Sequence, residues 1–360
     1  MLRSHLLLAM MGTAALASLA VACGDDAGTG GGGGGSSTPG GVSPPPRPAD
    51  APEGDGPGTI FGASHIYIGT KTRAGVETAD AWKDYGYDLD HQITASDFSN
   101  HCTPAGGAAP NNTFPDGTNG IDNAFGKVLL PIIKTAAATS VDDLEGSLNE
   151  AITDGSFTII MNLKNLGSAA DYSKIDSGLL AGKEGTSGGT VWKTVPEFPE
   201  VPFANSYVAG NTWVSGDQGT VSLNIGIAGF SLDLDIKAAY LTMDLASAHD
   251  GATGGVIAGV LDTEAFIEQL RDVLGAVQPS FCDGAAVEGI LNQIRQASDI
   301  MKDGSNGGGQ ECNGISIGIG FDAQVVTLDG VGSPADPVDP PCQEGGAGAG
   351  GGGQGGAGGG

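Results

Sequence analysis

Residues 220–245 read TVSLNIGIAGFSLDLDIKAAYLTMDL, and this stretch decides the fold class. Apolar side chains alternate with small or polar ones from Val221 to Ile227, which is typical of a strand with one buried face. Gly229 interrupts the alternation, and a second alternating run extends from Leu232 to Ile236. The stretch therefore predicts a β-hairpin.

The apolar positions of this stretch change parity beyond the hairpin. They are even-numbered from Leu232 to Ile236 and odd-numbered from Leu241 onward. A strand keeps one face toward the core only if an extra residue absorbs such a change. We therefore predict a β-bulge or a bend near Ala238–Tyr240.

Working outward, residues 315–325 alternate in the same way, while three other segments have helical periodicity. The predicted helices cover 140–152, 262–275 and about 284–302, each with one apolar stripe. One-sided alternation is typical of antiparallel sheets with a solvated face. The expected fold is mostly β (α+β): an antiparallel β-sandwich or jelly-roll-like core with a few peripheral amphipathic helices.

The N-terminus has the features of a lipoprotein export signal. Leu6–Ala20 is apolar but short for a membrane span, and it leads into Ala20-Val-Ala-Cys23. This resembles the lipobox, in which a cysteine thiol takes a diacylglycerol group before cleavage. We expect a signal peptide over 1–22, lipidation at Cys23, and anchoring to the outer membrane or cell surface; an ordinary secretory signal is the alternative.

Composition divides the rest of the chain. Residues 23–58 are rich in Gly, Ser and Pro, and residues 331–360 end in an almost pure Gly/Ala/Gln tail. Such segments bury too little apolar surface to offset the entropy of ordering them. We predict a disordered tether, a single β-rich domain over 59–330 and a disordered tail.

The chain is strongly acidic, with 42 Asp and Glu against 15 Lys and Arg. Nucleic acid is excluded as an expected partner, because little could neutralise its phosphates. The expected partners are a membrane, reached through the lipid, and a glycan or another surface protein. The acidic surface serves solvation, or it binds cations.

Four cysteines remain besides Cys23, and an even number in an exported protein predicts two disulfides. Three pairings are possible. We favour Cys282–Cys312 with Cys102–Cys342, because the first pair brackets one helix and its loop. A zinc site is the alternative, although no Cys-x-x-Cys spacing supports it.

Two stretches resemble a pattern of uncharacterised, glycine-rich exported bacterial lipoproteins. These are Gly86-Tyr-Asp-Leu-Asp90 and, beyond Cys102, Phe114-Pro-Asp-Gly-Thr-Asn-Gly-Ile-Asp-Asn-Ala-Phe-Gly126. They are similar to "DLDG", a cysteine-bearing loop and "DG–GIDN–FG". His91 stands where the pattern has glycine. The resemblance implies no activity.

The same two stretches hold the densest set of oxygen-bearing side chains. Carboxylate and amide oxygens beside glycines suit a hard cation such as Ca²⁺, although the spacing is not that of an EF-hand. Turn formation by Asp and Asn is the competing interpretation. The candidate calcium ligands are Asp88, Asp90, Asp116, Asn119, Asp122 and Asn123.

The remaining motifs point to no catalytic residue. Gly185-Thr-Ser-Gly-Gly189 matches Gly-x-Ser-x-Gly, but a polar loop precedes Ser187 where a nucleophile elbow needs a strand. Trp213 is the candidate for stacking on a sugar ring; burial in the core is the alternative interpretation.

Two functions are consistent with the sequence. The favoured one is a non-enzymatic surface module with a structural, adhesive or glycan-binding role, stabilised by calcium. The alternative is a secreted polysaccharide hydrolase with two paired carboxylates beside an open cleft.

Overall fold

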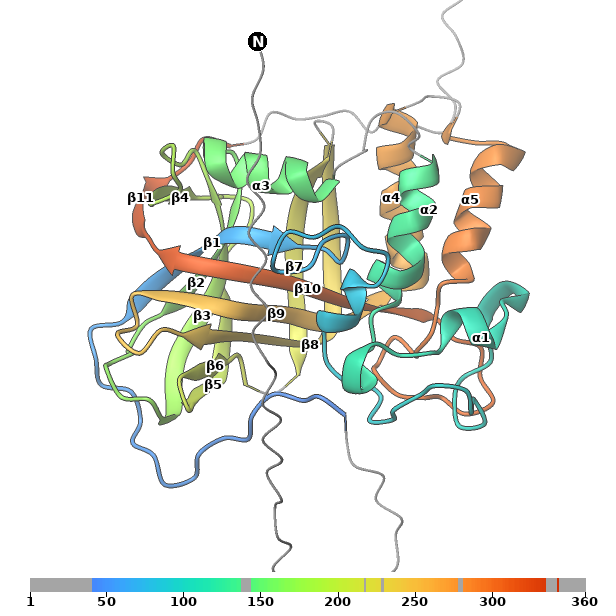
Figure 1. The fold of residues 1–360 in the computed structure, drawn as a ribbon. Helices are drawn as coiled ribbons and strands as arrows, with labels where there is room; N and C mark the ends of the chain where they lie inside the picture. The colour runs from blue at the N-terminus through green and yellow to red at the C-terminus, as the bar shows by residue number, and fades with distance from the viewer. Residues whose placement is uncertain are drawn as a thin grey trace, which may run out of the picture. The chain divides into compact units, whose positions relative to one another are not determined.

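Eight antiparallel strands form a closed ring in the computed structural model, which describes residues 41–136, 144–216, 218–227, 230–277, 281–334 and 342. Around the ring each strand pairs with the next, and the last pairs with the first (Figure 1). In ring order the strands are β1 (Thr59–Tyr67), β2 (Thr158–Leu163), β3 (Tyr172–Lys183), β5 (Val201–Ala209), β6 (Thr212–Val214), β8 (Phe230–Leu245), β9 (Gly251–Asp262) and β10 (Gly314–Val325).

The ring makes the core a β-barrel, so the predicted sandwich or jelly-roll is wrong. Two long-range pairings complete the ring: β3 with β5, through Leu179 and Val201, and β1 with β10, through Phe61 and Val325. A sandwich and a barrel both have strands with alternating inner and outer residues. Alternation alone therefore could not distinguish them.

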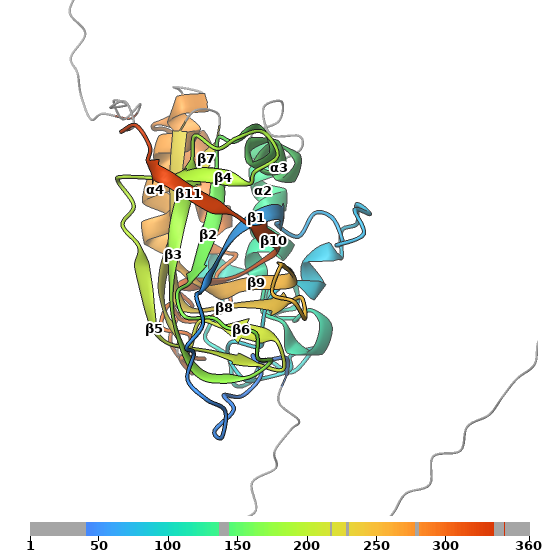
Figure 2. The same cartoon turned by 90° about the vertical axis from the view of Figure 1, so that its left-hand side faces the viewer.

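Three further strands lie outside the ring. β4 (Val191–Thr194) pairs with the end of β3, and β11 (Thr327–Val331) runs parallel to β4 (Figure 2). β7 (Gly219–Ile227) pairs with β8 alone among the described strands.

The predicted hairpin and bulge are confirmed. β7 and the first half of β8 form the hairpin, with Leu223 opposite Leu234. Between Lys237 and Tyr240 the β8 strand advances three residues while β9 advances two, and Ala238 has a φ of 47°. One extra residue thus restores the inward direction of the apolar side chains.

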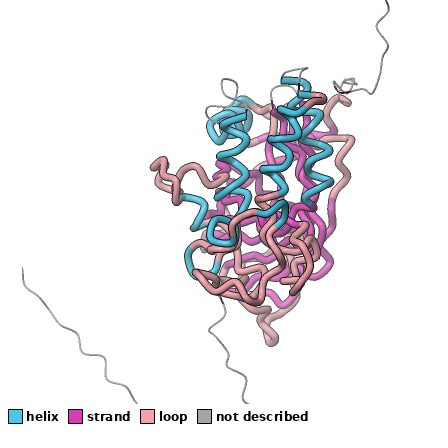
Figure 3. Tube along the Cα trace, turned by 90° about the vertical axis from the view of Figure 1, so that its right-hand side faces the viewer, coloured by secondary structure: helices cyan, strands magenta, loops and turns pink. Residues whose placement is uncertain are grey.

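The helices gather on one side of the strands (Figure 3). The predicted second and third helices are present as α4 (Thr263–Val277) and α5 (Ala285–Arg295), although α4 continues past Gly275 and α5 ends earlier than predicted. The first is α3 (Leu144–Asp154); its predicted start at 140 lies outside the described residues. Several short elements were not predicted from the sequence: α1 (Pro110–Thr113), α2 (Leu130–Ala136), the π-helical turn Phe125–Leu129 and the 3₁₀ turns Ala81–Asp84, Ala105–Gly107 and Thr118–Gly120.

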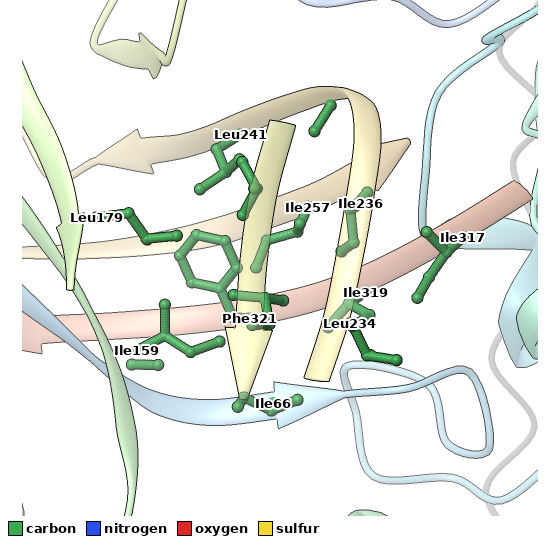
Figure 4. Packing of buried hydrophobic residues seen from close by; sticks show 14 of the residues in the cluster. Ile66, Ile159, Leu179, Leu234, Ile236, Leu241, Ile257, Ile317, Ile319 and Phe321 are labelled. Atoms are coloured by element: carbon green, nitrogen blue, oxygen red, sulfur yellow. The ribbon is translucent and has the colours of Figure 1, made fainter. Parts of the chain in front are cut away.

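Large apolar side chains fill the barrel. Leu179, Ile159, Leu241 and Ile257, from four different strands, gather around Phe321 of β10 (Figure 4). Each is at most 5 % exposed, so the interior is a packed core.

The outer face of β9 and β10 is also covered, although we expected it to be solvated. Val256, Ala258 and Val260 pack against Tyr87 and other apolar residues of the covering segments. This covering layer carries the acidic residues that the sequence analysis selected.

Residues 41–58 lie along the domain, although the sequence analysis placed them in the tether. Arg47 donates to the carbonyl oxygens of Ser173 and Asn205, and its guanidinium lies 4.5 Å from the centre of the Tyr207 ring. Backbone hydrogen bonds also join Gly54 to Lys174. The predicted signal peptide, Cys23 and most of the predicted tail lie outside the described residues. Among the described helices, none is long and apolar enough to cross a membrane.

Candidate metal centre

Three chain segments meet on the outer face of β10 and form the acidic site. Asp88 N donates to the carbonyl oxygen of Val42, and Asp122 N donates to that of Tyr87. A Cβ atom at Gly318 of β10 would collide with the carbonyl of Tyr85. Glycine at this position therefore lets the covering segment lie flat on the strand.

Three of the predicted ligands come together as a buried cluster. Asp88, Asp90 and Asp122 each offer a carboxylate oxygen, and these oxygens lie within 4.8 Å of one another. None of the three residues is more than 9 % exposed. Because Ca²⁺ binds oxygen at 2.3–2.6 Å, two ligands of one ion are at most about 5 Å apart. The cluster therefore has the dimensions of a cation site.

Backbone amides hold each carboxylate in place. Asp122 Oδ2 accepts from Leu89 N (2.7 Å), Asp88 Oδ2 from Gly41 N (2.8 Å) and Asp90 Oδ1 from Gln92 N (2.8 Å). Asp88 Oδ1 is buried and has no hydrogen-bond partner among the described residues. An unsatisfied buried oxygen is costly, and a cation would satisfy it.

Burial and the repulsion between neighbouring carboxylates raise the pKa of Asp90, Asp116 and Asp122. Desolvation is the main cause in each case, and neighbouring carboxylates add to it. The pKa of Asp90 rises to about 7 and that of nearby Asp116 to about 8, while the pKa of Asp122 is raised well above its usual range. A divalent cation would offset this repulsion.

The nearby cationic side chain of Lys127 binds elsewhere. Its Nζ donates to the carbonyl oxygens of Thr113 (3.2 Å) and Pro115 (2.8 Å). Burial lowers the pKa of Lys127. Lys127 therefore forms no ion pair with the three clustered carboxylates.

The other predicted ligands have different roles. Asn123 uses both ends of its amide: Nδ2 donates to three backbone carbonyls, and Oδ1 accepts from Gly126 N and Gly318 N. Asn119 is exposed, with a left-handed φ of 55° that marks a turn. Asp116 accepts from Thr94 N and lies outside the group of three. Turn formation, the competing interpretation, thus accounts for Asn119, whereas Asn123 ties the covering segment to β10.

Two residues of the site were missed by the sequence analysis. His101 Nδ1 lies 3.5 Å from Asp90 Oδ2, and its Nε2 is bonded to Thr94 Oγ1 at 2.8 Å. Burial lowers the pKa of His101. Asp299 accepts from the Ser316 amide and hydroxyl, and burial raises its pKa to about 6. Neither residue stands in a recognisable motif, so the sequence gives no signal for them.

The cysteines form two disulfides, but the favoured pairing was wrong. The bonds are Cys102–Cys312 and Cys282–Cys342. Cys312 lies just before β10, where the chain pairs with the Cys102 segment through Cys312 N and the carbonyl of Thr103 (2.9 Å). Cys282 and Cys312 lie on either side of one helix in the sequence, but each is paired with another cysteine in the structure.

Trp213 does not form the predicted sugar platform, because its side chain is completely buried in the barrel. Trp82 and Trp192 are buried as well. Ser187 lies in the loop between β3 and β4, and the predicted polar loop precedes it.

Comparisons of the chain with protein-family models, with curated proteins and with solved structures found no match. The functional assignment therefore rests on the residues and geometry of this protein alone.

Proposed function

We propose that this chain is an exported, lipid-anchored surface protein, without catalytic activity, whose domain is stabilised by a bound calcium ion. The single observation that carries the calcium site is the cluster of Asp88, Asp90 and Asp122. The lipid anchor rests on the sequence that ends in Cys23.

The chemistry of the cluster supports a hard divalent cation. All its side-chain donors are carboxylate oxygens, which Ca²⁺ prefers over nitrogen or sulfur. Three ionised carboxylates would carry three negative charges in a buried space, and one Ca²⁺ would offset two of them. Asp88 Oδ1 also has no protein donor among the described residues. A bound cation would therefore offset most of the negative charge and give Asp88 Oδ1 a partner.

The same burial argues against the polysaccharide hydrolase. A retaining or inverting glycosidase needs two carboxyls on either side of an accessible sugar bond. Asp88, Asp90 and Asp122 are at most 9 % exposed, which leaves no access for a sugar chain. The described residues offer no observation that favours the hydrolase.

Thermal melting of the full chain, with calcium and with a chelator, tests the cation site. A ligand at 100 times its Kd stabilises the folded state by about 2.7 kcal/mol. For a domain of this size, that corresponds to a rise of roughly 5–10 °C in Tm. An unchanged Tm would overturn the proposal.

Asp88→Asn sharpens this test, with Asp329→Asn as the matched control on an exposed carboxyl. Loss of a ligand should abolish most of the calcium response. In chelator the variant should melt at the same temperature as the wild type or higher, because it relieves repulsion. A purely structural role for Asp88 predicts the opposite, a lower Tm in both conditions.

A further inference from the structure

An apolar cavity of about 330 Å³ lies at the point in the barrel wall where strands β3 and β5 separate. β5 leaves β3 at the Leu179–Val201 pair, and β7 crosses nearby without a second partner strand among those described. Apolar residues of this region line the cavity, among them Phe157, Ile159, Leu179, Leu180, Val201 and Leu223. The volume falls in the range of roughly 300–1,000 Å³ that small-molecule sites occupy.

The polar groups of the cavity are few and specific. Ser222 Oγ donates to Asp235 Oδ1 at 2.6 Å, so these two side chains already pair with each other. Gln269 of α4 differs, because its Oε1 is buried and has no hydrogen-bond partner among the described residues. A buried acceptor beside an apolar space needs a donor from whatever fills that space.

The charge of the lining selects among possible ligands. No Lys, Arg or His is among the residues that line the cavity, whereas Asp235 is. A carboxylate or phosphate head group would lose its hydration there without gaining an opposite charge. An anionic lipid is therefore disfavoured, while a hydroxyl or an amide N–H suits the Gln269 oxygen.

We propose that this cavity binds an uncharged amphiphile: an apolar chain or ring system that carries one hydroxyl or amide N–H. The apolar body contacts the walls supplied by β2, β3, β5 and β7. The head group donates a hydrogen bond to Gln269 Oε1. This site lies apart from the acidic cluster and does not depend on the cation.

Photolabelling of the full chain in phosphatidylcholine nanodiscs tests the proposal. The probes are decan-1-ol and decanoate, each with the same diazirine in its chain, and the labelled peptides are mapped by mass spectrometry. We expect the alcohol to label peptides from β3, β7 and α4, in competition with plain decan-1-ol. Decanoate should label them about tenfold less, because its charge is not compensated.

Two substitutions locate the site. Gln269→Leu should reduce labelling by about 3- to 10-fold, the value of one hydrogen bond, whereas Gln293→Leu on the exposed face of α5 should not. Leu180 is half-buried in the cavity wall, so Leu180→Trp should fill the cavity and abolish labelling. If the Leu180→Trp variant does not fold, Gln269→Leu still tests the proposal. Equal labelling by decanoate, unchanged labelling of Gln269→Leu, or scattered labelling without competition would overturn the proposal.

Discussion

Asp88 and Asp90 illustrate what single residues determine in this protein. The sequence predicted both as calcium ligands, and the structure brings their carboxylate oxygens within 4.8 Å of each other. Asp122 joins them through hydrogen bonds from Leu89 N and Asp90 N. Sequence patterns could not separate these candidate ligands from Asn123. The side chain of Asn123 is fully hydrogen-bonded to backbone groups, and only the fold determines which side chains are engaged in this way.

The pH dependence of stability follows from the same residues. Unfolded carboxyls have a pKa near 4, whereas burial raises the pKa of Asp90 to about 7 and of Asp116 to about 8. Between these values the folded chain binds more protons than the unfolded chain. The free energy of unfolding of the cation-free protein should therefore fall as pH rises from about 4 to 8.

Urea denaturation in chelator at several pH values across this window would measure the fall. With saturating calcium the fall should be much smaller, because the ion stabilises the ionised carboxylates. Stability in chelator that increases with pH over the same window would contradict the raised pKa values.

At the scale of elements, the bulge in β8 is the feature that sequence parity predicted best. Before the bulge β8 pairs with β7, and beyond it β8 pairs with β6. The extra residue thus turns one strand from the hairpin into the barrel. Helix ends were predicted less well: α5 stops at Arg295, although apolar residues continue to Met301, because Ile300 forms a bridge with Gly314 instead.

Ala238→Gly should stabilise the protein by about 0.5–1 kcal/mol. Ala238 has a φ of 47°, a conformation that is unfavourable for any residue with a Cβ atom. Ala239→Gly is the control, because Ala239 is buried, has a negative φ and should lose about 1 kcal/mol. Urea denaturation compares the two, and equal losses in both variants would refute strain at the bulge.

The disulfides should differ in their effect on stability. Cys102–Cys312 joins residues 210 apart and Cys282–Cys342 joins residues 60 apart, so the first restricts the unfolded chain more. Replacing both cysteines of the first pair with serine should cost about 2–5 kcal/mol, and replacing those of the second pair should cost less.

Of the two disulfides, the first lies beside the cluster of Asp88, Asp90 and Asp122. Cys102 directly follows His101, and His101 contacts Asp90. Loss of the first disulfide should weaken the calcium-induced rise in Tm, whereas the serine variant of Cys282 and Cys342 should keep that rise. Equal loss in both variants would show that the cluster does not depend on the Cys102 segment.

At the scale of the whole molecule, barrel closure was the part of the fold that sequence could not reveal. Local patterns identified the β7–β8 hairpin and β10, but closure depends on pairs such as Phe61 with Val325, far apart in the chain. No local pattern encodes such a pairing, because any strand with one apolar face could occupy that edge. The cavity at Gln269 forms between strands and a helix that only the closed barrel brings together, so the sequence could not predict it either.

The proposed location at a membrane depends on lipidation of Cys23, and substitution of this residue tests the proposal directly. Cys23→Ser should abolish incorporation of radiolabelled palmitate in cells, because a serine hydroxyl does not replace the thiol in the acylation reaction. Cys342→Ser is the matched control and should still incorporate the label. Each buried methylene of an acyl chain contributes about 0.8 kcal/mol to membrane binding, so two or three chains on Cys23 would hold the protein firmly. The wild-type protein should therefore stay with membranes in high salt, and a wild-type chain without palmitate, or a Cys23→Ser variant that still incorporates it, would refute the lipid anchor.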